Sequence, residues 1–134
     1  MIYFNVREVR EYLVTHGEVY TIRNPRSEGT TDAVHGNYRK QTKICRVQVE
    51  LVTKNITSID QLVDYAFKSG ITVPITLSAF KPDARQIATK WLDLAHQLSG
   101  QNGETLHLYH VIKMPELNSP ALLTTPFFVG RLER

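Results

Sequence analysis

Residues 42–53 read TKICRVQVELVT, and this stretch decides the fold class. Hydrophobic side chains alternate with polar ones, so that one face would hold Cys45, Val47, Val49 and Leu51 and the other Arg46, Gln48 and Glu50. A period of two residues is typical of a β-strand with one buried face. We therefore predict a long strand here, with its apolar face against a hydrophobic core.

Several elements are predicted on the N-terminal side of this strand. Residues 1–4 are short and apolar and favour a first or edge strand. Asn5 begins a capping-box spacing, which predicts a helix that starts there and ends at Gly17. Residues 18–23 are rich in β-branched and aromatic side chains and predict another strand. Residues 24–41 show no regular pattern of apolar and polar side chains and are rich in turn residues, so we expect a long loop.

The C-terminal side predicts helices and further strands. Residues 58–70 begin with a capping-box spacing and carry an apolar stripe of helical period. Residues 82–100, opened by a proline and closed by a glycine, carry a wider stripe and predict a second helix. Residues 71–77 contain a proline and predict an extended connection or at most an edge strand. Strands are predicted over residues 105–113 and 127–132.

The order of these elements bounds the architecture. They do not repeat as regular βαβ units, so we do not expect a doubly wound parallel sheet. We predict an α+β fold, a small mixed β-barrel or strongly twisted sheet flanked by helices. A length of 134 residues suits one domain. We expect residues 1–134 to form it, with residues 115–134 as a C-terminal extension packed on the rest.

Composition excludes several classes of protein. A chain that is 42% hydrophobic and 22% charged is neither intrinsically disordered nor collagen-like. Cys45 is the single cysteine, which excludes an intramolecular disulfide and favours a reducing, cytoplasmic location. No stretch has the roughly 20 apolar residues of a membrane span, so we expect no membrane contact. His107 and His110 fall on opposite faces of their predicted strand, and we expect no metal and no cofactor.

Positive charge is concentrated in one part of the sequence. The whole chain has a net charge of +3, whereas residues 23–54 contain seven basic and three acidic residues, a local +4. If the strands at residues 18–23 and 42–53 pair, their basic side chains converge on one rim. Guanidinium and ammonium groups bind phosphates, and a tyrosine ring stacks on bases. The candidate ligand-binding residues on this rim are Arg23, Arg26, Tyr38, Arg39, Lys40, Lys43 and Arg46. A solvated loop that keeps the protein soluble is the alternative.

Gly17 is followed, after a short interval, by the segment Thr21-Ile22-Arg23. With the order of elements over most of residues 1–114, this segment resembles the ASCH domains of the PUA-like superfamily. The resemblance implies a small barrel flanked by helices, with a cleft between them for RNA or a modified nucleoside. Thr21 and Arg23 would line that cleft.

The resemblance also bears on catalysis. Some ASCH domains hydrolyse N-acylated cytidine with a lysine shortly after the glycine, a nearby threonine and a glutamate. Glu18 and Val19 occupy the matching stretch of this chain, so that lysine is absent. Lys40, Lys43 and Glu50 are the remaining candidates for handling protons, and no catalytic residue is assigned.

Two functional hypotheses follow, with RNA or another phosphate-bearing ligand as the expected partner. The first is a nucleic-acid-binding module that uses the basic rim. The alternative is a small-molecule enzyme, similar to an amidohydrolase, that acts on a modified nucleoside in the same cleft. A closed cavity favours the alternative, and an open basic groove favours the first. A protein-interaction domain is a third possibility, and the residues give no indication of an oligomeric state.

Overall fold

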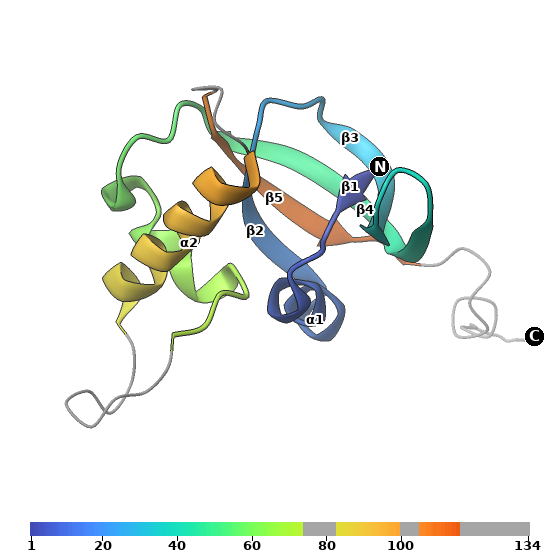
Figure 1. Cartoon of the computed structure of the whole chain (residues 1–134), viewed down its shortest axis with the longest axis horizontal. Helices are drawn as coiled ribbons and strands as arrows, with labels where there is room; N and C mark the ends of the chain where they lie inside the picture. The colour runs from blue at the N-terminus through green and yellow to red at the C-terminus, as the bar shows by residue number, and fades with distance from the viewer. Residues whose placement is uncertain (74–82, 100–104, 116–134) are drawn as a thin grey trace, which may run out of the picture.

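Five strands form one mixed sheet in the order β1-β3-β4-β5-β2 in a computed structural model of the chain, which describes residues 1–73, 83–99 and 105–115. The strands are β1 (Ile2–Tyr3), β2 (Glu18–Arg23), β3 (Gly29–Gly36), β4 (Gln41–Thr53) and β5 (His107–Lys113). β1 pairs with β3 in parallel, and the other neighbours are antiparallel. The sheet is strongly curled into a half-barrel (Figure 1).

Helices flank this sheet. They are α1 (Arg7–His16), the 3-10 segments η1 (Ile59–Gln61) and η2 (Val63–Lys68), and α2 (Ala84–Ser99). Helix α1 packs against β2 and β5, while α2 packs against η2 and β2 (Figure 1). The predicted α+β class, with a strongly twisted sheet flanked by helices, is confirmed at this level.

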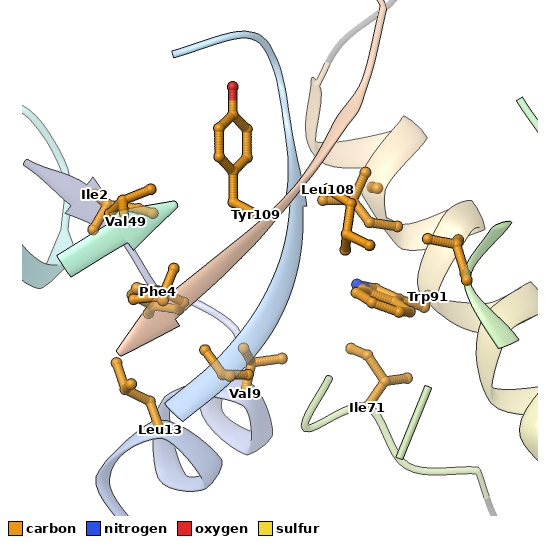
Figure 2. Packing of buried hydrophobic residues seen from close by; sticks show 14 of the residues in the cluster. Ile2, Phe4, Val9, Leu13, Val49, Ile71, Trp91, Leu108 and Tyr109 are labelled. Carbon is orange, nitrogen blue, oxygen red and sulfur yellow. The ribbon is translucent and has the colours of Figure 1, made fainter. Parts of the chain in front are cut away.

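The long strand that decides the fold is confirmed as β4. Cys45, Val47 and Val49 are buried, while Arg46 and Glu50 on its other face are exposed. Val49 lies opposite Val111 of β5, which in turn lies opposite Val19 of β2. These three fully buried valines join the strands into one core, and burying each contributes roughly 1.5–3 kcal/mol. Figure 2 shows Val49 in this core with Phe4, Trp91 and Tyr109.

For the first predicted helix, the end at Gly17 is confirmed and the start at Asn5 is wrong. Gly17 has a left-handed backbone with φ of 78°, and its N–H donates to the carbonyl of Leu13, as expected of a helix stop. However, α1 begins at Arg7, and Asn5 does not cap it. The Asn5 amide instead donates to the Gly36 carbonyl at 2.9 Å and accepts from the Gly36 N–H at 2.8 Å. The side chain therefore ties the N-terminal segment to β3.

The predicted long loop over residues 24–41 is also wrong, because it contains β3. This strand pairs with β4 along its whole length. The register shifts between Ala33 and Val34, and both of these consecutive residues are buried. A bulge of this kind breaks the alternation that marks a strand in the sequence.

The predicted helix over residues 58–70 is a pair of 3-10 segments. Its capping box is present, because Ser58 and Gln61 bond to each other's backbone. Its apolar stripe is buried at Leu62 and Ala66. Gly70 follows with φ of 78°, and a Cβ there would lie 2.8 Å from the Cα of Val9. The segment thus ends in a close approach to α1 that only glycine allows.

The remaining predictions fall partly outside the described residues. The second helix is confirmed as α2 from Ala84 onward, and the strand at residues 105–113 as β5. The strand at residues 127–132 and nearly all of the extension at residues 115–134 lie outside the described part. Within residues 1–73, 83–99 and 105–115, no helix combines the length and apolar character that crossing a membrane requires.

Candidate functional site

A cavity of about 470 Å³ opens beside the edge strand β2. Its walls come from the N-terminal segment, from β2 and the residues after it, from the connection after η2, and from α2. Most of this wall is apolar and includes Phe4, Ile22, Trp91, Leu94 and Leu98. In Figure 2 the ribbon of β2 passes between Phe4 and Trp91. The volume lies within the range of about 300–1,000 Å³ that small-molecule sites occupy.

Arg23 brings a positive charge to this apolar wall. Its Nε donates to the Thr21 hydroxyl at 3.0 Å, and its guanidinium carbon lies 4.8 Å from the centroid of the Phe4 ring. Among the described residues, no carboxylate forms an ion pair with it. Burial, and then the nearby Arg26, lowers the pKa of Arg23 to about 10. The side chain is therefore still a cation at neutral pH.

Arg26 brings a second cation, and its backbone is fixed. The Tyr109 hydroxyl accepts from the Arg26 N–H at 2.8 Å and donates to the Arg26 carbonyl at 3.2 Å. One terminal nitrogen of Arg26 donates to the Met1 carbonyl at 3.3 Å. The Nε of Arg26 is buried, and no described residue accepts from it. Burial lowers the pKa of Arg26, and Tyr109 acts in the opposite direction.

Asn24, which lies between the two arginines in the sequence, has an unpaired acceptor. Its side-chain oxygen is buried and receives no hydrogen bond from the described residues. Buried polar atoms in proteins are nearly always hydrogen-bonded, and buried charges are nearly always paired. The cavity thus joins an apolar wall to two arginines that no described carboxylate pairs with, which is the arrangement of a site that takes a polar ligand. The unpaired atoms of Asn24 and Arg26 are themselves buried and do not face the open cavity.

The other basic candidates lie on the β3–β4 hairpin. Tyr38, Arg39 and Lys40 occupy its turn, and Tyr38 is 78% exposed. The guanidinium of Arg39 lies 5.5 Å from the centroid of the Tyr38 ring, and its Nε donates to the Tyr38 hydroxyl at 3.0 Å. Farther along β4, Lys43 and Arg46 both pair with Asp32, at 3.7 and 3.1 Å.

The single basic rim expected from the sequence does not form, because β2 and β4 do not pair. β5 lies between them, and β3 takes the other side of β4. The eight candidate residues divide into two groups. Thr21, Arg23 and Arg26 line the cavity. The hairpin group consists of Tyr38, Arg39, Lys40, Lys43 and Arg46.

The candidates for handling protons lie elsewhere. Lys40, Lys43 and Glu50 are exposed and are not among the described residues that line the cavity. Trp91, expected in the core, is indeed only 4% exposed, but its ring also forms part of the cavity wall. Asn24 and Phe4 carried no signal in the sequence, because an isolated asparagine in a turn and a short apolar N-terminus are common in any protein.

The histidines of β5 take separate structural roles on opposite faces, as predicted. His107 accepts from the Asn55 N–H at 3.2 Å, and His110 lies 2.7 Å from a carboxylate oxygen of Glu18. The His110 ring stacks on Tyr20, with centroids 4.3 Å apart. In the described part of the chain, no three histidine, cysteine or acidic side chains gather closely enough to hold a metal ion.

No protein-family model matches the chain, and neither a curated protein nor a solved structure matches it. Function is therefore inferred from the geometry of the cavity and of the hairpin.

Proposed function

We propose that the protein binds a small organic ligand with a flat, apolar body in the cavity beside β2. The observation that carries this proposal is a cavity of about 470 Å³ with a mostly apolar wall and two arginines, Arg23 and Arg26, that no described carboxylate pairs with. A site of this kind holds the body of a ligand by apolar burial and orients it through a few polar contacts. Leu94 and Leu98 of α2 supply accessible apolar surface, and Phe4 and Trp91, which are 1% and 4% exposed, close the wall from the core side.

The same features support an assignment to the PUA-like superfamily, with an ASCH-like arrangement. The curled mixed sheet, the helices beside it and the lining of the cavity by Thr21 and Arg23 agree with what the resemblance implies. Glu18, in the stretch where ASCH domains carry a lysine, pairs with His110 instead. We therefore propose ligand binding and assign no catalytic step.

Filling the cavity tests this function. Trp91 is the single tryptophan of the chain, so its indole N–H signal in a proton–nitrogen NMR spectrum reports on the cavity wall. We expect titration with neutral 1-naphthol to shift this signal until it saturates. Ala95→Phe places a ring in the cavity and should abolish the shift, while the matched control His96→Phe, at the next, exposed position of α2, should keep it.

A second variant keeps the test valid if Ala95→Phe perturbs folding. Leu98 lines the cavity and is 68% exposed, so Leu98→Phe can narrow the cavity without disturbing the core. It should weaken the binding of 1-naphthol. A Trp91 signal that does not respond in the wild type, or that responds equally in the filled variants, would contradict the proposal.

A second candidate function, nucleic-acid binding, is favoured by the hairpin turn. Tyr38 is exposed and carries the Arg39 guanidinium near its ring, beside Lys40. An exposed ring among cations is a stacking surface for single strands. We expect labelled single-stranded RNA to bind with an affinity that falls with salt, by a logarithmic slope of about −0.7 per phosphate contact.

The hairpin is tested by a double variant. Arg39→Ala with Lys40→Ala should reduce the salt slope by about 1.4 in magnitude. The control, Lys54→Ala with Lys68→Ala, removes the same charge at exposed positions outside the hairpin and should leave the slope nearly unchanged. Undetectable or salt-insensitive binding by the wild type would contradict this second function.

A further inference from the structure

We propose that the ligand of the cavity is a phosphate monoester whose phosphate is held by Arg23 and Arg26. This inference rests on the proposed function, that the cavity takes an organic ligand, and adds its chemical class. It follows from the charge, the free donors and the fixed backbone at one end of the cavity.

The charge of the site favours a doubly charged anion. Of the four exposed arginines of the described chain, Arg7, Arg46 and Arg85 have carboxylate partners at 2.9, 3.1 and 2.8 Å. The fourth, Arg39, donates to the Tyr38 hydroxyl instead. Arg23 and Arg26 have no such partner among the described residues, although both are more buried. A phosphate monoester carries a charge of about −1.5 to −2 at neutral pH and balances two cations. A carboxylate would leave one of them without a partner.

The free donors match the oxygens of a phosphate. Arg23 uses its Nε on Thr21, so both of its terminal nitrogens have no partner in the described chain. Arg26 donates from one terminal nitrogen to the Met1 carbonyl, and its other terminal nitrogen has no partner in the described chain. A phosphate monoester presents three strong acceptor oxygens, and guanidinium groups bind such oxygens through short, charge-assisted hydrogen bonds.

The site is held in place before the ligand arrives. The Tyr109 hydroxyl fixes the backbone of Arg26 from both sides, and the Phe4 ring lies against the guanidinium of Arg23. Preorganised groups lose less entropy on binding.

A matched series of probes tests the class of ligand. 1-Naphthyl phosphate, 1-naphthoate and 1-naphthol share one ring system and differ only in the group that faces the arginines. Charge-assisted hydrogen bonds make the phosphate bind roughly 100-fold more tightly than the alcohol and roughly tenfold more tightly than the carboxylate. Dissociation constants come from the shift of the Trp91 indole signal.

Variants separate the charge from the cavity. Arg23→Met and Arg26→Met should each lower the ratio of 1-naphthyl phosphate affinity to 1-naphthol affinity by roughly tenfold. Arg46→Met, on the hairpin, is the control and should change neither. Arg23→Lys serves if the methionine variant folds poorly. It retains the positive charge but loses the forked donors, and should weaken phosphate binding by roughly tenfold.

The outcomes distinguish this inference from the proposed function. If 1-naphthol shifts Trp91 but the phosphate binds no more tightly, the cavity takes a neutral ligand and the inference is overturned alone. If 1-naphthoate binds more tightly than 1-naphthyl phosphate, the ligand is not a phosphate monoester and the inference is overturned. If none of the three probes shifts Trp91, the proposed function fails as well. A 5′-phosphorylated trinucleotide serves as a further probe. If it displaces 1-naphthyl phosphate, the natural phosphate belongs to the end of a nucleic-acid strand, and the inference of a free small molecule is overturned.

Discussion

The positive charges of the cavity and those of the β3–β4 hairpin differ in their exposure and in their acidic partners. On the hairpin, the side chains of Lys43 and Arg46 are 60% and 54% exposed and share the carboxylate of Asp32. Beside β2, Arg23 and Arg26 are more buried and have no acidic partner in the described chain. Exposed pairs contribute about 0–1 kcal/mol, whereas an unpaired charge away from water lowers stability. Basic residues close together in the sequence thus differ in what they can do for a ligand.

The largest expected effect is on stability. Arg23→Met removes a cation that is desolvated without a carboxylate partner, so we expect the free energy of unfolding, measured in urea without ligand, to rise by about 1 kcal/mol or more. Arg46→Met removes an exposed pair and should lower it by less than about 1 kcal/mol. Strong destabilisation by Arg23→Met would show that the charge is compensated, and the contrast between the two regions would disappear.

The affinity of the cavity for 1-naphthyl phosphate should depend on pH through Arg23. Because the pKa of Arg23 is lowered to about 10, raising the pH through that value removes its proton in the folded state before the unfolded state loses its own. Binding of 1-naphthyl phosphate should weaken by up to about tenfold per pH unit above this pKa.

The stability of the free protein should change in the opposite direction. The unfolded chain binds more protons at this residue between the two pKa values, so the wild type gains stability with rising pH relative to Arg23→Met. Urea unfolding of both proteins at about pH 9 and about pH 11 measures the difference, roughly 1 kcal/mol. An identical pH dependence of the two proteins would contradict the lowered pKa.

The smallest expected effect concerns Asp32. Asp32→Asn removes the shared partner of Lys43 and Arg46 and leaves the hairpin more positive. We expect RNA to bind roughly two- to fivefold more tightly at low salt, while 1-naphthyl phosphate binds the cavity as before. If RNA affinity does not change, Lys43 and Arg46 do not contact the strand, and the hairpin surface is limited to its turn.

The sequence predicts those parts of the fold that follow one regular period. Residues 42–53 alternate without a break, and β4 forms there with Val47 and Val49 fully buried. β3 was missed because its bulge buries Ala33 and Val34 in succession. The start of α1 was misplaced because the best capping residue, Asn5, bonds to Gly36, 31 positions away. The start of α1 thus depends on a contact between segments that are distant in the chain, whereas β3 departs from a regular period because of a bulge against its neighbour β4.

The residues of the site likewise divide into those that the sequence predicts and those that it does not. Thr21, Arg23 and Arg26 were recognisable from a local motif and a local excess of charge, and they line the cavity. Their separation from Lys43 and Arg46 was not recognisable, because it depends on strand order, and β5 lies between β2 and β4 in the sheet. The aromatic side chains of the wall, Phe4 and Trp91, likewise lie far apart in the sequence.

One measurement compares the two regions directly. In proton–nitrogen spectra of the wild type titrated with 1-naphthyl phosphate, the backbone signals of Thr21, Asn24 and Arg26 and the indole signal of Trp91 should shift together and saturate at one ligand concentration. The signals of Tyr38, Arg39 and Lys40 at the hairpin turn should remain in place. Shifts confined to the hairpin turn, with the cavity signals unchanged, would contradict a ligand site beside β2.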